Sequence, residues 1–164
     1  MDNCGYNERM SNIIQENVKE FMQKAGQETP NHTVTPTDED RMLRVSLLLE
    51  EVLELAEASG VCIHPTNEDG TILYNNLTKD QFSFGITNSE VDMVEVADAV
   101  ADINYVSYGC AITYGIDMEP IDAEVHRSNM SKFIDGHRRD DGKWVKGKSY
   151  SSPNIKALIE AQTI

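Results

Sequence analysis

The feature that most constrains the fold of this sequence is an apolar helical run between about residues 88 and 114. Its large apolar residues recur at helical spacing and cover most sides of the expected helix. They are Val91, Val94, Val100, Ile103, Val106 and Tyr108. Asn88 or Ser89 is expected to cap this helix and Gly115 to end it. Because it is apolar on most sides, we expect it to be a central, buried helix of an all-α domain.

The same run carries four acids and no lysine or arginine, the acids being Asp92, Glu95, Asp98 and Asp102. A buried carboxylate without a partner is very costly. A cation from elsewhere is therefore expected beside this helix.

A second acidic helix is expected over residues 37–59, where Thr37 begins an N-terminal cap and Gly60 ends the run. Its acids are Glu50, Glu51, Glu54 and Glu57. At about 100° per residue, most of them fall on one stripe. One interpretation is a solvated acidic face, and the other is a divalent ion held between the two helices. Carboxylate oxygens suit Mg²⁺, with Mn²⁺ as a substitute.

Further helices are expected over residues 10–25, from Pro120 to about residue 134, and as a short last helix starting at Ser152-Pro153. The segment 60–87 has no clear period and is expected to be an insertion, in which residues 61–63 and 71–74 form a short hairpin. These patterns predict one all-α domain over residues 1–164, with a four-helix-bundle core over about 38–135. Residues 136–152 form a basic, glycine-punctuated loop that is expected to act as a lid.

Charge and composition exclude several classes of function. The formal net charge is −14, which disfavours DNA, RNA and anionic membranes as partners. No apolar run is long enough to span a bilayer, and the N-terminus lacks the pattern of a secretion signal. Three widely spaced cysteines are typical of reduced thiols, so a cytoplasmic location is expected. Seven of the 14 basic residues lie between Arg127 and Lys148, which suits a polyphosphate ligand.

The acids form the pattern Glu50-Glu51-x-x-Glu54 followed by Glu95-x-x-Asp98. This pattern resembles the MazG-like, all-α nucleoside triphosphate pyrophosphohydrolases. The later run Ser128-Asn129-Met130-Ser131-Lys132 resembles a phage and bacterial branch labelled phosphoribosyl-ATP pyrophosphohydrolase-like, and the likeness covers about residues 41–155. The resemblance implies that the five acids coordinate Mg²⁺ in a four-helix bundle. It also implies a homodimer or a dimer-based tetramer, which the apolar helix independently favours.

The resemblance also suggests roles for individual side chains. Glu50 is expected to hold a second metal or to deprotonate the attacking water, and Lys132 to stabilise the pyrophosphate leaving group. Asn129 is expected to bind a phosphate or sugar oxygen. Asp102 either supports the metal site or contacts the base. Lys146 and Tyr150 are expected to close over the nucleotide; both lie in the basic loop.

The expected activity is therefore Mg²⁺-dependent hydrolysis of a (deoxy)nucleoside triphosphate to a monophosphate and pyrophosphate, in control of the dNTP pool. The location would be the bacterial cytoplasm, or the host cytoplasm for a phage protein. One alternative is phosphoribosyl-ATP hydrolysis in histidine biosynthesis, and another is a catalytically silent regulatory bundle. A calcium-binding module is disfavoured because the EF-hand loop pattern is absent from the sequence.

Overall fold

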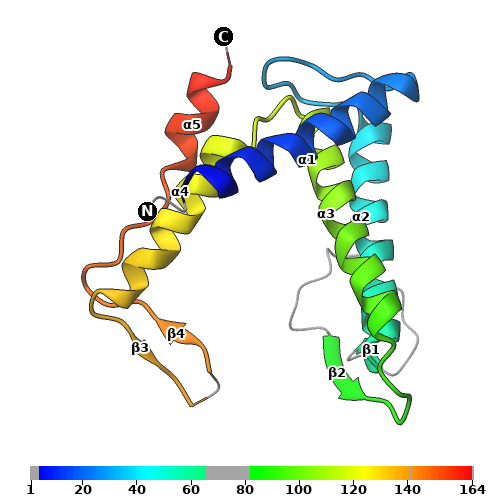
Figure 1. The fold of residues 1–164 in the computed structure, drawn as a ribbon, viewed down its shortest axis with the longest axis vertical. Coiled ribbons are helices and arrows are strands. Elements are labelled where there is room, and N and C mark those ends of the chain that lie inside the picture. The colour runs from blue at the N-terminus through cyan, green and yellow to red at the C-terminus, as the bar shows by residue number, and fades with distance from the viewer. Residues whose placement is uncertain (1–3, 66–81, 141, 164) are drawn as a thin grey trace. The chain divides into compact units, whose positions relative to one another are not determined.

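The computed structural model describes residues 4–65, 82–140 and 142–163. Of the described residues, 57% are helical, which confirms the all-α expectation. Within the described residues the helices are α1 (Cys4–Lys24), α2 (Asp38–Ala58), α3 (Met93–Thr113), α4 (Glu119–Met130) and α5 (Ile155–Ala161) (Figure 1). No helix there is long and apolar enough to cross a bilayer.

The chain divides into two compact units, which are described separately. Unit 1 comprises Met1–Asp40 and Tyr108–Ile164, and unit 2 comprises Arg41–Ser107. Unit 1 thus contains α1, α4, α5 and the end of α3, whereas unit 2 contains nearly all of α2 and most of α3.

Helix α2 begins and ends where its local sequence predicts. The Thr37 hydroxyl accepts a hydrogen bond from the Asp40 amide at 3.1 Å and donates one to the Asp40 carboxylate at 2.6 Å. Three acids occupy the first turn, where the helix dipole favours negative charge. At the other end Gly60 has a φ of +65°, a conformation that glycine adopts without strain.

Helix α3 begins later than predicted. The Asp92 carboxylate accepts hydrogen bonds from the amides of Val94, at 2.9 Å, and Glu95, at 3.2 Å, so Asp92 acts as the N-terminal cap. The expectation that Asn88 or Ser89 caps this helix is therefore wrong. Those residues connect a strand to the helix, and the preceding Thr87 amide donates to the Gly60 carbonyl at 2.7 Å.

The segment between α2 and α3 contains an antiparallel strand pair. Strand β1 (Val61–Pro65) pairs with β2 (Phe82–Ile86), with Val61 opposite Ile86 and Pro65 opposite Phe82. The strand expected over residues 61–63 is therefore present, and its described partner is β2. The partner expected from the sequence, residues 71–74, lies outside the described residues.

Unit 1 is built around a small buried core. Val18 and Met22 on α1 pack with Ile112 on α3, and Ile14 and Tyr108 cover this cluster. Helix α4 contacts α1 and has its proline in the first turn, as predicted. It continues into the 3₁₀ turn η2 (Ser131–Phe133).

The C-terminal basic segment has more structure than the predicted loop. Strand β3 (His137–Arg138) pairs with β4 (Trp144–Val145), and the Phe133 and Trp144 rings meet edge-on with centroids 4.6 Å apart. The Ser151 amide donates to the Ser131 hydroxyl at 2.9 Å, which ties the segment to η2. Helix α5 begins at Ile155, so the expectation that Ser152-Pro153 starts it is wrong by two residues.

Candidate metal centre

In unit 2, α2 and α3 run side by side in opposite directions (Figure 1). They flank a cavity of about 630 Å³. Six carboxylates line it, and they belong to Glu54, Glu57, Glu90, Asp92, Glu95 and Asp98. The other lining residues are Ala58, Ser89 and Ala99. Among the described residues, every ionisable group that lines this cavity is therefore acidic.

The Glu51 side chain, on α2, shows how crowded the negative charge is. Burial raises the pKa of its carboxyl, and nearby carboxylates raise the pKa further; they are Glu54, Asp102, Glu50 and Asp98. One carboxylate oxygen, Oε2, is buried and has no hydrogen-bond partner among the described residues. A buried oxygen of this kind is costly unless a cation or a donor satisfies it.

The structure thus brings the acids of the two helices into one neighbourhood. Glu54, Glu95 and Asp98 line the cavity. The remaining acids of the predicted site, Glu50 and Asp102, are near enough to Glu51 to raise its pKa. Their donor set is all carboxylate, which fits Mg²⁺. As the described side chains stand, no three acidic, histidine or cysteine groups converge closely enough to hold a metal. Carboxylates repel one another, so convergence requires a cation to offset that repulsion.

The acids of α3 are less buried than the sequence indicates. Glu95, Asp98 and Asp102 are all exposed, as is the capping Asp92. The expectation of burial is therefore wrong for these side chains in the described structure. The cavity also includes Glu90, which sequence reasoning missed. Glu90 lies in the non-helical connection before α3, where no helical spacing relates it to the other acids.

The other predicted site residues lie in unit 1, around the end of α4. The Lys132 ammonium donates to the Asn129 side chain at 2.7 Å. The Lys146 ammonium lies 4.1 Å from the centre of the Tyr150 ring, a cation–π contact. The Ser128 hydroxyl is 3.3 Å from the Tyr150 hydroxyl. That hydrogen bond is the main cause of a lowered Tyr150 pKa, to which Lys146 also contributes.

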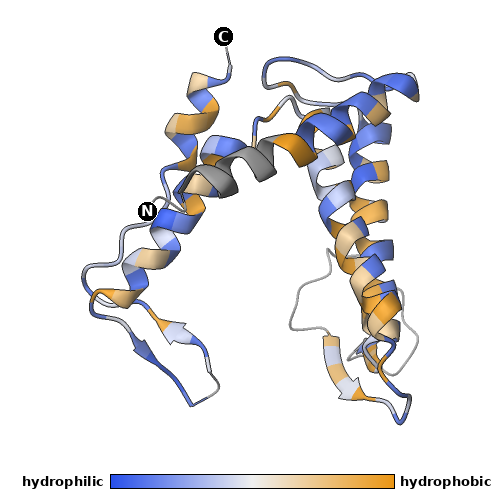
Figure 2. Ribbon diagram, viewed as in Figure 1, coloured by the Kyte–Doolittle hydropathy of each residue, from blue (hydrophilic) through white to orange (hydrophobic). Residues whose placement is uncertain are grey.

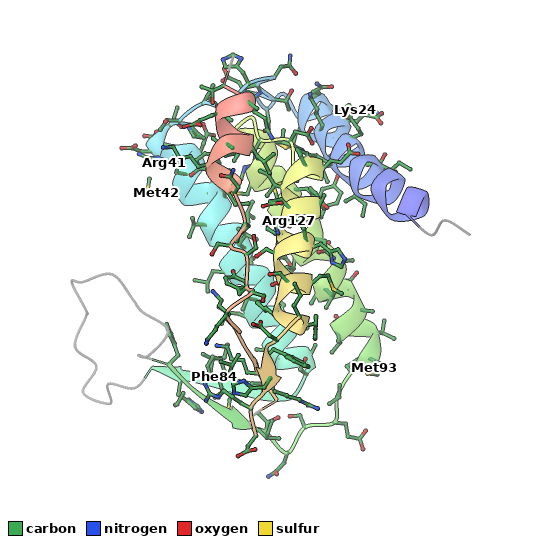
Figure 3. The ribbon with its side chains drawn as sticks, turned by 90° about the vertical axis from the view of Figure 1, so that its left-hand side faces the viewer. Lys24, Arg41, Met42, Phe84, Met93 and Arg127 are labelled. Atoms are coloured by element: carbon green, nitrogen blue, oxygen red, sulfur yellow. The ribbon has the colours of Figure 1, made fainter. Side chains whose placement is uncertain are left out.

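An ion pair on α4 helps to hold the C-terminal segment. The Arg127 guanidinium binds both carboxylate oxygens of Glu124, at 2.7 and 2.8 Å, and donates to the Ser152 carbonyl at 3.2 Å. Glu124 also accepts from the Asn154 amide at 2.8 Å. The Arg127 hydrogen bond first, and the Asn154 amide second, lower the Glu124 pKa to about 2. Arg127 is labelled on α4 in Figure 3.

Comparison with protein families identifies a match that extends from α1 to α4. The family model described as phosphoribosyl-ATP pyrophosphohydrolase matches residues 15–129, well over half of the chain. The matched range contains all the acids of α2 and α3 and ends at Asn129, before Lys132 and the basic segment. No curated protein matches the chain.

Proposed function

The chain belongs to the phosphoribosyl-ATP pyrophosphohydrolase family, within the MazG-like all-α superfamily, and from that premise we propose its substrate and metal. The family makes it a nucleotide pyrophosphohydrolase. We propose that it hydrolyses a nucleoside triphosphate between the α- and β-phosphates, releasing a monophosphate and pyrophosphate, with Mg²⁺ as the cofactor.

The preference that we propose, for a nucleoside triphosphate over phosphoribosyl-ATP, rests on the acidic cavity of unit 2. Phosphoribosyl-ATP bears a further phosphate on its ribosyl group, remote from the triphosphate. Phosphates are usually bound by arginine, lysine or helix N-termini. Among its described lining residues the cavity has carboxylates and no basic side chain. Glu57 and Glu90 also line the cavity, and they would repel a second phosphate group even if a metal neutralised the triphosphate end. A nucleoside end, which is uncharged, avoids that repulsion.

The proposed metal ligands are Glu50, Glu51, Glu54, Glu95 and Asp98. The buried oxygen of Glu51, which has no hydrogen-bond partner in the part of the chain that the structure describes, and the all-carboxylate donor set support this assignment. Bound Mg²⁺ neutralises phosphate charge and makes a coordinated water more acidic. Glu50 is proposed to accept the proton of the attacking water. Lys132 stays a prediction as a phosphate contact, and Asn129 as a contact to a phosphate or sugar oxygen. Lys146 and Tyr150 stay predictions as residues that close over the nucleotide.

A substrate panel tests the proposal. Purified protein is incubated with Mg²⁺ and each common ribo- and deoxyribonucleoside triphosphate, and separately with phosphoribosyl-ATP, while monophosphate and pyrophosphate are quantified. We expect at least one triphosphate to be hydrolysed with a higher kcat/KM than phosphoribosyl-ATP. A preference for phosphoribosyl-ATP would instead mean that this protein has the activity named in the family description. Inactivity on every substrate would favour the regulatory bundle.

We also propose that unit 2 is covered by a second copy of the chain in a homodimer. In the described part of unit 2 only Arg44, Gly60 and Ala99 are buried. Large apolar side chains on α2 are exposed, including Val45 at 65% and Leu49 at 57%. Figure 2 shows hydrophobic residues along both helices of this unit. Two helices leave part of their apolar surface uncovered, and a further helix pair would complete a four-helix bundle.

Exposed apolar side chains occur at both ends of unit 2. Met42 lies near the start of α2, whereas Phe84 and Met93 lie towards the opposite end (Figure 3). The dimer proposal is tested with Leu49→Glu, with Phe21→Glu in unit 1 as the matched control at similar exposure, 56%. Light scattering after gel filtration should give a dimer for the wild type and the control, and a monomer for Leu49→Glu. A monomeric wild type would contradict the proposal.

A further inference from the structure

The turn that connects α3 to α4 is held by two glutamine side chains from distant parts of unit 1. Gln15, on α1, donates from Nε2 to the Ile116 carbonyl at 2.7 Å. Its Oε1 accepts from the Met118 amide at 3.0 Å. One carboxamide therefore binds the main chain on both sides of Asp117, as a neighbouring strand would.

Gln162, just after α5, holds the residue in between. Its Oε1 accepts from the Asp117 amide at 2.8 Å, and its Nε2 donates to the Asp117 carbonyl at 3.1 Å. The remaining groups of the turn are used as well. The Ile116 amide donates to the Ala111 carbonyl at 3.0 Å, and the Met118 carbonyl accepts from the Asp122 amide at 2.7 Å. Every main-chain polar group from Ile116 to Met118 thus has a partner.

Other segments of unit 1 close on the same turn. The Val34 amide donates to the Tyr114 carbonyl at 3.0 Å, and the Thr33 amide to the Gln162 carbonyl at 3.2 Å. Gly115 has a φ of +68°, and a Cβ there would overlap the His32 carbonyl. The turn is therefore enclosed by α1, the connection after it and the end of α5, which leaves little freedom for its backbone.

The residue type matters because only a carboxamide side chain both donates and accepts in this geometry. A glutamate in either position would keep the acceptor but lose the donor, and it would set a carboxylate against a carbonyl oxygen. A methionine of similar length would lose both bonds. Neither Gln15 nor Gln162 can therefore be replaced by an apolar residue of similar size without losing these hydrogen bonds.

We propose that Gln15 and Gln162 are positioning residues, which clamp the α3–α4 turn and so hold α4 in one orientation on the end of α3. The turn lies between the helix that carries Glu95 and Asp98 and the helix that carries Asn129. The clamp therefore sets where the polar side chains of α4 are presented. Its consequence for catalysis rests on the proposed function, whereas its effect on the turn does not.

Amide-resolved hydrogen exchange on the full chain tests the clamp itself. In Gln15→Met the Met118 amide should exchange at least tenfold faster, while in Gln162→Met the Asp117 amide should do so. Gln15→Glu keeps the acceptor, so the Met118 amide should remain slower than in Gln15→Met. The matched control is Gln23→Met, also on α1, whose side chain donates to the Thr29 hydroxyl at 3.1 Å. It should leave both amides unchanged.

Kinetics on the nucleotide that the wild type hydrolyses best then test the positioning role. Both methionine variants should raise KM about tenfold and change kcat less, while Mg²⁺ raises their melting temperatures as in the wild type. Unchanged exchange at Asp117 and Met118 would overturn the clamp. Faster exchange with unaltered KM and kcat would overturn the positioning role. Wild-type inactivity would count against the proposed function, and the exchange pattern would still decide the clamp.

Discussion

Unit 1 and unit 2 differ in where their helices find partners. Unit 1 buries Val18, Met22 and Ile112. In this unit the Gln15 side chain also binds main-chain groups that lie 101 and 103 positions away in the sequence. In the described part of unit 2 the only buried residues are Arg44, Gly60 and Ala99, and the cavity between the helices is lined by carboxylates. Unit 1 therefore has its own source of stability. Unit 2 buries little in its described part, and the proposed cation and second copy would offset its negative charge and cover its apolar side chains.

The largest expected effect comes from removing a proposed metal ligand in unit 2. Glu54→Gln and Asp98→Asn should each lower kcat by at least about 100-fold, because each would deprive the proposed Mg²⁺ of a ligand while the transition state needs its charge. The helical circular dichroism should persist, and the melting temperature of the metal-free protein should stay level or rise as repulsion is relieved. Glu39→Gln, in the first turn of α2, is the control. Near-normal activity of either variant at limiting Mg²⁺ would contradict the metal site.

The next effect separates a core of unit 1 from an interface of unit 2. Met22 is 1% exposed, so Met22→Ala should lower the free energy of unfolding by about 2–5 kcal/mol. This loss should not depend on protein concentration. Leu49 is 57% exposed, so Leu49→Ala should cost little in the monomer and more where the dimer forms. Urea unfolding at two protein concentrations measures both, and concentration-independent behaviour of Leu49→Ala would count against a dimer through α2.

A smaller effect is expected from the Glu124–Arg127 pair of unit 1. The Glu124 pKa is lowered from 4.5 to about 2 on folding, so the folded state binds fewer protons than the unfolded state. The stabilisation is fully present above pH 4.5 and is lost as pH falls towards about 2. Arg127→Met should flatten this part of the profile of melting temperature against pH. Lys156→Met removes the exposed pair with Glu160, at 3.7 Å, and should leave the profile as in the wild type.

The smallest effect is expected in the basic segment. The Lys146–Tyr150 contact is open to solvent on the lysine side and the Ser128–Tyr150 hydrogen bond is only partly buried, which weakens both interactions. Lys146→Ala and Tyr150→Ala should raise KM a few-fold and leave Mg²⁺ affinity unchanged. Lys132→Ala should lower kcat by a larger factor than either of these two variants does. Protease cleavage at Arg138 and Arg139 should slow when Mg²⁺ and a non-hydrolysable nucleotide are added. Equal cleavage with and without ligand would contradict closure of this segment.

The acids of the candidate site were predictable because they repeat at helical spacing along single helices. Spacing alone predicted that Glu54 and its neighbours share a stripe, and the structure brings this stripe into the neighbourhood of Asp98 and Asp102. Glu90 was not predictable because it lies outside any helix. The helical position expected for Asp92 was wrong for a related reason. Its carboxylate caps the helix because α3 begins at Met93, after the connection from β2.

The sequence by itself determined the helical class, the limits of α2 and the stripes of carboxylate. All three depend on residues within about four positions of one another, such as Thr37 with Asp40, or a glycine directly after a helix. Only the tertiary structure decided the partner of β1 and the clamp made by Gln15 and Gln162. These contacts join residues far apart in the chain, and a lone glutamine carries no local signal of the peptide group it will bind, because that choice depends on how the surrounding helices pack.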